Sequence, residues 1–291
     1  YAMDPDDPRA PTEEQWAAMT GDERARVVAM LPTDMPWELH PPEGDSHRAP
    51  KDSARDALGE HFRRKGRNIY VSSELTTYYA GQPRFCPDVL AVVDVGLHAR
   101  ESWIVSVEGK GLDFVLEVHS SGDHKKDFET NVERYARLGI PEYFAFDCPR
   151  ARLWGWRLPD PTAASYQRIV PQAGRLRSNV LDLELCEEDG RVRFYDGNAP
   201  LLFVDELVHR LEAMVDALIV ARDDAMQHAE AEQQRAEEEK QRAEEEKQRA
   251  EEEKQRAEEQ KQRAEEQKQR AEKLALEVAQ LREELAKAKK P

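Results

Sequence analysis

Two hydrophobic patterns divide the chain into a compact region and a polar one. Apolar residues recur throughout residues 35–222, whereas residues 228–273 contain almost no large apolar side chain. The first region is long enough to bury one substantial core. We therefore predict a helical or flexible N-terminal segment (residues 1–37), a globular domain (38–222) and a charged heptad-repeat helix (223–291).

Within the globular domain, the period of the apolar residues alternates between that of strands and that of helices. Runs rich in β-branched and aromatic residues predict strands over residues 68–79, 88–95, 112–119, 142–147, 153–158, 166–170, 180–186 and 192–195. Helical spacing predicts helices over 12–31, 52–64, 123–138 and 201–221. The pair Asp189-Gly190 predicts a hairpin turn. Together these elements predict an α/β body.

The polar region repeats QRAEEEK with a period of seven, which places alanine at one heptad position: Ala236, Ala243, Ala250, Ala257, Ala264 and Ala271. If this is position a, Glu or Gln occupies position d, which makes a poor apolar seam. Beyond Ala271 the same frame puts Leu274 and Leu281 at d, and Val278 and Leu285 at a. Pairs such as Glu238 and Arg242 stabilise an isolated helix by about 0.3 kcal/mol each. We expect a lone ion-paired helix whose last heptads can join two chains as a homodimer.

Charge limits the partners that the body can hold. The chain carries −16, and residues 228–291 hold 19 acidic and 16 basic side chains, so −13 remains for residues 1–227. Nucleic-acid affinity depends largely on neutralising phosphates. A nucleic-acid partner would therefore require a local basic rim, or metal ions that reverse the local field.

Composition also suggests where the protein works. No apolar stretch is long enough to span a bilayer, and residues 1–11 are acidic and proline-rich, unlike a signal peptide. The cysteines Cys86, Cys148 and Cys186 are widely spaced and form no C-x-x-C pair. We predict a cytoplasmic protein with reduced thiols and no membrane partner.

Two carboxylates stand out among apolar strand residues. Asp88 follows Pro87 at the start of one predicted strand, and Glu117 lies near the end of another, on the same face as Val115 and His119. A carboxylate in apolar surroundings is costly unless it is paired or binds a cation. Two carboxylates from neighbouring strands repel each other, and a divalent ion such as Mg²⁺ relieves that repulsion. The alternative is that both are ordinary surface or turn residues.

Several longer segments carry a family resemblance. Pro87-Asp88, LDFVLEVHSSGD (112–123), NVERYARLGIPEYFAFD (131–147) and SNVLDLEL with RVRFYDG (178–197) together resemble the Uma-two family of endonucleases, in the PD-(D/E)XK restriction-endonuclease-like superfamily. The resemblance covers about residues 38–206 and includes the charged tail. It implies an α/β fold with a mixed sheet flanked by helices, followed by a long C-terminal α-helix or coiled coil. It further implies Asp88 and Glu117 as metal ligands, Mg²⁺ (or Mn²⁺) as cofactor, and nucleic acid as partner, with DNA favoured over RNA.

The chain departs from the family's motif where a lysine is expected. The position two residues after the glutamate holds His119, and the alternative position on the following helix holds Asn131. Asparagine can position a water but supplies no positive charge. The candidates to replace the lysine are His119, Lys125, Lys126 and Arg134.

Two functions therefore remain open. The first is a metal-dependent endonuclease that hydrolyses phosphodiester bonds, with Asp88, Glu117, His119, Lys126 and Asn131 as its candidate site residues. The second is a catalytically degenerate nuclease-fold module that binds nucleic acid or acts as a scaffold through its helical stalk.

Other side chains have simpler explanations. His47 precedes the helix predicted from residue 52, so a loop or capping role is favoured over a catalytic one. Glu60 and Glu74 are favoured as solvent-facing residues. Trp154 and Trp156 alternate along a predicted strand, which favours packing over base stacking.

Overall fold

The computed structural model describes residues 1–36 and 44–288, and contacts between residues divide the chain into two units, Tyr1–Arg210 and Leu211–Pro291. The first unit contains the α/β body. Its helices are α1 (Glu13–Ala18), α2 (Gly21–Met30), α3 (Asp45–Lys65), α4 (Val105–Glu108), the π-helix η1 (Lys126–Thr130), α5 (Asn131–Arg137) and the 3₁₀ turn η2 (Cys148–Arg150). Helix α6 (Val204–Ala288) begins in the first unit and forms the second.

The central sheet of the body has six strands in the order β1-β3-β5-β6-β7-β8, with these bounds: β1 Ile69–Ser72, β3 Val89–Val93, β5 Phe114–His119, β6 Glu142–Asp147, β7 Arg152–Arg157 and β8 Gln167–Arg168. Strands β5 and β6 run parallel, and the other neighbouring pairs in this sheet run antiparallel. Strands β5 and β6 are buried along their whole length, as expected for parallel strands covered on both faces. The predicted mixed sheet is confirmed.

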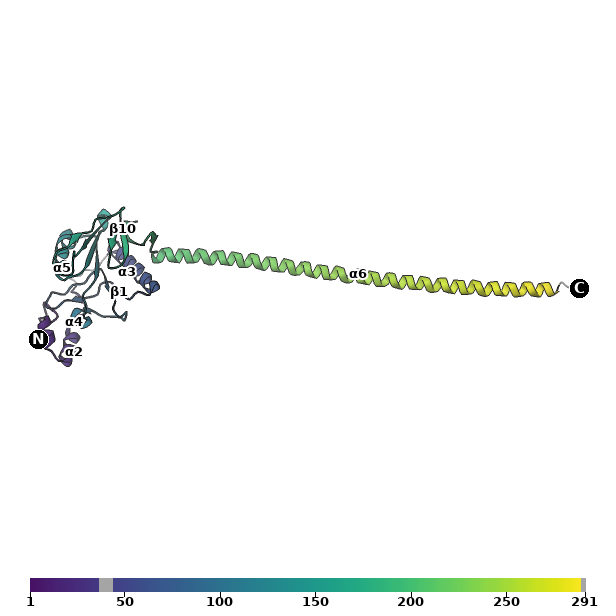
Figure 1. The fold of residues 1–291 in the computed structure, drawn as a ribbon, viewed down its shortest axis with the longest axis horizontal. Helices are drawn as coiled ribbons and strands as arrows, with labels where there is room; N and C mark the ends of the chain where they lie inside the picture. Colours follow the sequence, from purple (N-terminus) through teal and green to yellow (C-terminus); the bar gives the residue numbers. More distant parts are fainter. Residues whose placement is uncertain (37–43, 289–291) are drawn as a thin grey trace. The chain divides into compact units, whose positions relative to one another are not determined.

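One face of the central sheet is covered by α3 and by a second, antiparallel sheet. That sheet has the order β12-β11-β10-β9, with β9 Leu176–Ser178, β10 Leu183–Glu188, β11 Arg191–Asp196 and β12 Ala199–Pro200. Helix α3 lies beside β1 and β11 (Figure 1). Leu58 and Phe62 of α3, Phe144 of β6 and Phe194 of β11 share one buried cluster. This cluster is the larger part of the core.

The opposite face of the central sheet is covered by α5 and by a short parallel pair of strands, β2 (Thr77–Tyr78) and β4 (Trp103–Ile104). Trp103, Tyr135 and Tyr143 form a second buried cluster there with Val115 of β5. Helices therefore lie on both faces of the sheet, as predicted. The side chains of β5 alternate between the two clusters, because Phe114, Leu116 and Val118 belong to the first cluster.

Backbone conformation explains where the elements differ from the sequence prediction. The strand predicted over residues 68–79 ends at Ser72 and resumes as β2 in another sheet, since Glu74 takes a left-handed φ of 53°. The predicted Asp189-Gly190 turn is confirmed, with φ of 52° and 73°, the conformation that a tight hairpin requires. Strand β9 was not predicted.

Two helix predictions needed correction. Helix α3 begins at Asp45 instead of residue 52 and carries Pro50 inside it, which places His47 on a helix and not in a loop. The helix predicted over 12–31 is two helices, because Thr20 caps the start of α2 and its side chain accepts a hydrogen bond from Glu23 N–H. The predicted 123–138 helix is present, but residues 126–130 form a π-helical turn.

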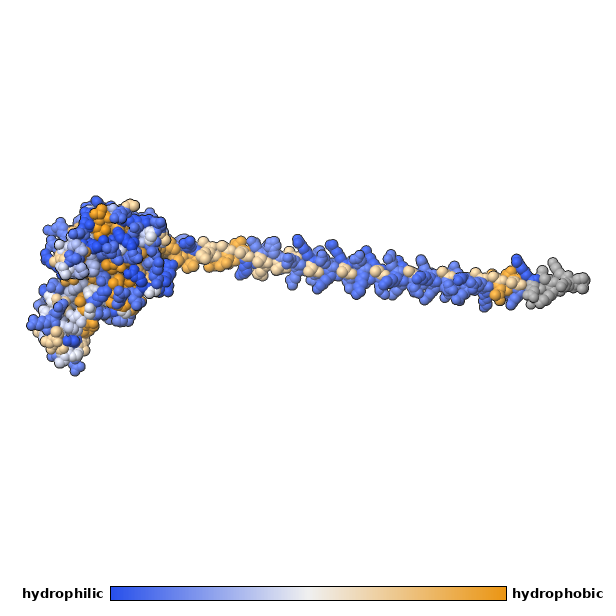
Figure 2. All heavy atoms as spheres, viewed as in Figure 1, coloured by the Kyte–Doolittle hydropathy of each residue, from blue (hydrophilic) through white to orange (hydrophobic). Residues whose placement is uncertain are grey.

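Helix α6 carries the heptad repeat. Ion pairs of 3.8 Å join Glu238 to Arg242 and Glu252 to Arg256, so the first of these predicted pairs is confirmed. Figure 2 shows apolar side chains towards both ends of α6 and polar side chains along its middle. Within the described residues, no helix is long and apolar enough to cross a membrane.

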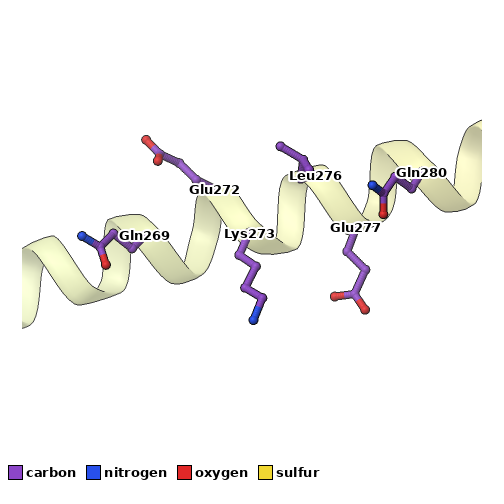
Figure 3. Close-up of a pocket in the computed structure, with 6 residues that line it drawn as sticks. All are labelled: Gln269, Glu272, Lys273, Leu276, Glu277 and Gln280. Carbon is purple, nitrogen blue, oxygen red and sulfur yellow. The ribbon is translucent and has the colours of Figure 1, made fainter.

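A shallow depression on α6 lies among Gln269, Glu272, Lys273, Leu276, Glu277 and Gln280. One helix supplies all six side chains, and Figure 3 shows Glu272 and Leu276 pointing away from Lys273 and Glu277. The side chains do not converge on a common point. This depression therefore lacks the enclosure that a small-molecule site needs.

Candidate active site

Asp88 and Glu117 meet at the end of the antiparallel pair formed by β3 and β5. The register pairs Val89 with Leu116, which puts Asp88 directly across from Glu117. Both side chains are almost fully buried, with 5% and 6% of their surface exposed. Glu117 Oε2 accepts a hydrogen bond from Asp88 N–H at 3.3 Å, and Asp88 Oδ2 accepts one from Val118 N–H at 2.6 Å. The structure thus brings together the two carboxylates that the sequence singled out.

Each of the two carboxylates has one further side-chain partner. Tyr135 of α5 donates its hydroxyl hydrogen bond to Glu117 Oε1 at 2.5 Å. His47 of α3 places Nε2 3.1 Å from Asp88 Oδ2. The pair is therefore held from two sides, by a helix on each face of the sheet.

Burial and nearby charges shift the pKa values of the two acids in opposite directions. Burial raises the pKa of Glu117 well above its usual range, and the nearby Asp88 and Asp127 carboxylates raise it further. Burial also acts to raise the pKa of Asp88, but the nearby His47, the Val118 N–H and the charge of Lys51 together act to lower it, and the pKa of Asp88 is lowered. Of the two acids, Asp88 therefore ionises more readily than Glu117.

A buried lysine lies close to this pair. Lys51 is one helical turn after His47 on α3, its side chain is 2% exposed, and its Nζ forms an ion pair with Glu74 Oε1. Its positive charge helps to lower the pKa of Asp88. Glu74 is itself tied to the motif, since its N–H donates to Pro87 O at 3.0 Å. Lys51 thus brings a positive charge towards the carboxylates from an element other than the expected one.

His119 and Asn131 meet at a different carboxylate. Asp127 Oδ2 lies 3.0 Å from His119 Nδ1, and Asn131 Nδ2 donates to Asp127 Oδ1 at 3.3 Å. Tyr143 donates its hydroxyl hydrogen bond to Asp127 O at 2.7 Å. Burial raises the pKa of Asp127. These residues form a second buried polar group beside Glu117, built on the π-helical turn η1, and such turns are frequent at functional sites.

The other lysine replacements considered from the sequence lie differently. Arg134 Nη2 donates to Pro83 O at 2.6 Å, which holds its guanidinium against the loop before Asp88. Lys125 is exposed and pairs with Glu129 at 3.7 Å. Lys126 is exposed, and its charge acts to lower the pKa values of Asp127 and Glu117. Of these residues, Lys126 acts electrostatically on the carboxylates and Arg134 fixes the loop.

Four contributors to the site were not predicted from the sequence: His47 as a partner of Asp88, Lys51, Asp127, and Tyr135 as a partner of Glu117. His47 and Lys51 are four residues apart, a spacing that puts both on one helix face. This signal was hidden because Pro50 argues against a helix over these residues. Glu60 was correctly predicted to face solvent, and it pairs with Arg63.

The donor set suits a small oxygen-seeking cation. Magnesium is often bound by one or two carboxylates, with water and substrate oxygens completing its octahedron. Asp88 and Glu117 offer such a pair, and their mutual repulsion is what a cation would relieve. Among residues 1–36 and 44–288, no three His, Cys, Asp or Glu side chains are grouped closely enough to hold a metal by themselves.

The family model of Uma2, described as "Putative restriction endonuclease", matches residues 35–191, more than half of the chain. The chain therefore belongs to the Uma2 family.

Several solved chains are similar to this one. The chain is similar to the crystal structure of a "putative nuclease belonging to DUF820" from Anabaena variabilis, with 12% identity and a TM-score of 0.38, over 48% of this chain and 75% of that chain. No curated protein matches the sequence.

Proposed function

We propose that this protein is a metal-dependent endonuclease that hydrolyses phosphodiester bonds of nucleic acid, with DNA as the favoured substrate. The observation that carries the proposal is the direct opposition of Asp88 and Glu117 in a buried setting. Membership of the Uma2 family supports it. Burying two carboxylates together is costly in free energy, and binding of Mg²⁺ or Mn²⁺ between them would offset that cost.

The side chains around the pair would prepare it for a cation. When bound, Mg²⁺ activates water and stabilises the negative charge that grows on a phosphodiester. The Val118 N–H fixes the Asp88 carboxylate, and the Tyr135 hydroxyl fixes that of Glu117. Because burial raises the pKa of Glu117, metal binding would compete with protonation of this carboxylate.

Lys51 is our candidate for the positive charge that Asn131 does not provide. Its side chain is buried, and its charge already acts on Asp88. In this proposal Lys51 stabilises the scissile phosphate while His47 orients Asp88. His119 and Asn131 act through Asp127, which they hold beside Glu117, and the charge of the exposed Lys126 acts on both Asp127 and Glu117.

Cleavage assays test the proposal. Supercoiled plasmid, single-stranded DNA and RNA are incubated with the full chain while Mg²⁺ or Mn²⁺ is titrated. The expected result is metal-dependent cutting that is lost in the Asp88→Asn, Glu117→Gln double variant. These substitutions keep the size of each side chain and so spare the fold. Equal cutting by the double variant would overturn the assignment.

The second candidate function is a degenerate module that binds nucleic acid without cutting it, and the neutral Asn131 favours it. The two functions differ in their response to Asn131→Lys. A degenerate site would show no cutting in the natural chain and would gain it in the variant. If the active site relies on Lys51, the natural chain would cut nucleic acid and the Asn131→Lys variant would cut only slightly faster.

We further propose that two copies of the chain associate through the last heptads of α6. Leu274, Val278 and Leu281 are 59%, 43% and 58% exposed on the single helix. In the same frame Glu277 is at g and Arg282 at the following e, the positions that pair between parallel helices. Sedimentation of the full chain should show a dimer that Leu274→Glu with Leu281→Glu dissociates, and a monomer at all concentrations would contradict the pairing.

A further inference from the structure

Two arginines contact one tryptophan at the edge of the central sheet. The guanidinium carbons of Arg152 and Arg168 lie 4.1 and 3.7 Å from the centre of the Trp154 ring system. Arg152 is two residues before Trp154 on β7, and Arg168 of β8 pairs with Trp156, two residues after it. The two guanidinium groups thus reach the indole from the two directions along the strand. Contacts of this kind hold a cation in place without neutralising it.

The two positive charges have no anionic partner within the part of the chain that the structure describes. No hydrogen bond or ion pair joins either guanidinium to a carboxylate across residues 1–36 and 44–288. In contrast, Arg157 of the same strand pairs with Glu142 at 2.7 Å. Burial lowers the pKa of Arg168, and the charge of Arg152 lowers it further. Two neighbouring like charges in an acidic protein form a place where an anion would bind favourably.

The register of the sheet places this pair of cations near the carboxylates. Glu117 of β5 is aligned with Ala145 of β6, and Ala145 with Trp154 of β7, so the three residues form one row on one face. Neighbouring strands are about 4.8 Å apart, which puts Trp154 about 10 Å from Glu117. Nucleotides advance by about 3.4 Å along each strand of a duplex. The cations are therefore about three nucleotide steps from the carboxylate pair.

We propose that Arg152 and Arg168, spaced by Trp154, bind the phosphodiester backbone of the nucleic acid a few nucleotides from the bond held at Asp88 and Glu117. This inference rests on the proposed function for its substrate class. It supplies the local basic rim that an acidic body needs. Trp154 serves as a spacer and not as a base-stacking surface, because its ring contacts both guanidinium groups and the edge of Phe128.

The test measures binding apart from cutting. Fluorescence anisotropy measures how tightly labelled duplex and single-stranded DNA bind to the full chain carrying Asp88→Asn and Glu117→Gln. These substitutions remove both proposed metal ligands. Adding Arg152→Ala with Arg168→Ala should weaken binding about tenfold or more at low salt. The slope of log K against log salt should fall by about 1.8 for a duplex, since each lost phosphate contact contributes about 0.9.

A matched control separates a local site from general charge. Arg63→Ala with Arg137→Ala removes the same charge from exposed, ion-paired arginines on α3 and α5, and it should weaken binding far less. Equal weakening by both pairs of substitutions, or no weakening by the first, would overturn the inference. Arg152→Lys with Arg168→Lys keeps the charge and should retain most of the binding, and thermal unfolding confirms that the alanine variant is folded.

The outcomes distinguish this inference from the proposed function. If the natural chain cuts DNA but the alanine pair binds as tightly as its parent, the backbone contact is wrong and the nuclease stands. If the natural chain never cuts DNA but binding depends on Arg152 and Arg168, the contact stands and the nuclease is wrong.

Discussion

The carboxylates of the body and those of α6 are the same chemical groups in opposite surroundings. Glu117 is 6% exposed, and burial raises its pKa well above the usual range. Glu238 is 68% exposed and forms a loose pair with Arg242 four residues away. Water screens the second carboxylate, so its pair contributes little. The buried Glu117 carboxylate has no such screening, so each neighbouring charge changes the free energy of its ionisation. The number of charged residues alone would suggest α6 as the functional region, but the buried carboxylates lie in the central sheet.

The same contrast applies to apolar side chains and predicts the largest effect. Phe144 is fully buried between the two sheets, and Leu276 is 64% exposed on α6. Phe144→Ala should lower the free energy of unfolding of the body by about 3–5 kcal/mol. Leu276→Ala should change it by less than about 0.5 kcal/mol. Denaturant titration monitored by tryptophan fluorescence measures both, and similar values would remove the contrast.

The buried lysine gives the next largest effect. Lys51→Met removes the charge but keeps the length of the side chain, and its partner Glu74 is 42% exposed. Cleavage should slow by about 100-fold, because a charge aimed at the developing anion is lost, while Mn²⁺ affinity changes much less. Lys51→Arg should recover part of the rate. A Lys51→Met variant with the natural rate would show that Lys51 only supports the structure.

The response of stability to pH gives a smaller effect. Glu117 has a raised pKa in the folded protein, so its contribution to stability is present below its unfolded pKa and is lost as pH rises through the folded pKa. In EDTA, the natural chain should therefore lose stability relative to Glu117→Gln as pH rises above the usual pKa range of glutamate, on the order of 1 kcal/mol. Saturating Mg²⁺ should reverse the sign, and a pH-independent difference would contradict the burial of this acid.

The smallest effect belongs to the ion pairs of α6. Glu238→Gln should reduce helix stability by about 0.3–0.5 kcal/mol, and less in high salt. Circular dichroism at 222 nm during thermal unfolding measures this change. A loss as large as that of Phe144→Ala would mean that a partner covers this part of the helix.

The fold was predictable where local pattern and burial agree. The two faces of strand β5 were predicted because successive side chains of a strand point to opposite faces, and the Asp189-Gly190 turn was predicted because those residues suit positive φ. The break at Glu74 in the strand predicted over residues 68–79 was not predictable, because tertiary contacts impose the left-handed backbone conformation of Glu74. Gly155 is similar: a Cβ there would lie 2.8 Å from Phe144 Cε1, which no local pattern reveals.

The site was predictable only in part, for a related physical reason. The pairing of Asp88 with Glu117 follows from two strand positions, and strand neighbours can be inferred from sequence. Lys51 and His47 reach the pair from α3, whose first turns were hidden by Pro50. Contacts between distant elements depend on the packed core, and the sequence alone did not reveal them.

The most direct test of the account is to locate a metal. Crystals of the full chain soaked in Mn²⁺ should show an anomalous peak about 2.1 Å from a carboxylate oxygen of both Asp88 and Glu117. The Asp88→Asn, Glu117→Gln variant should show no such peak. A peak elsewhere, such as beside His119 and Asp127, or none at a saturating concentration, would contradict the claim that these two buried carboxylates form a metal site.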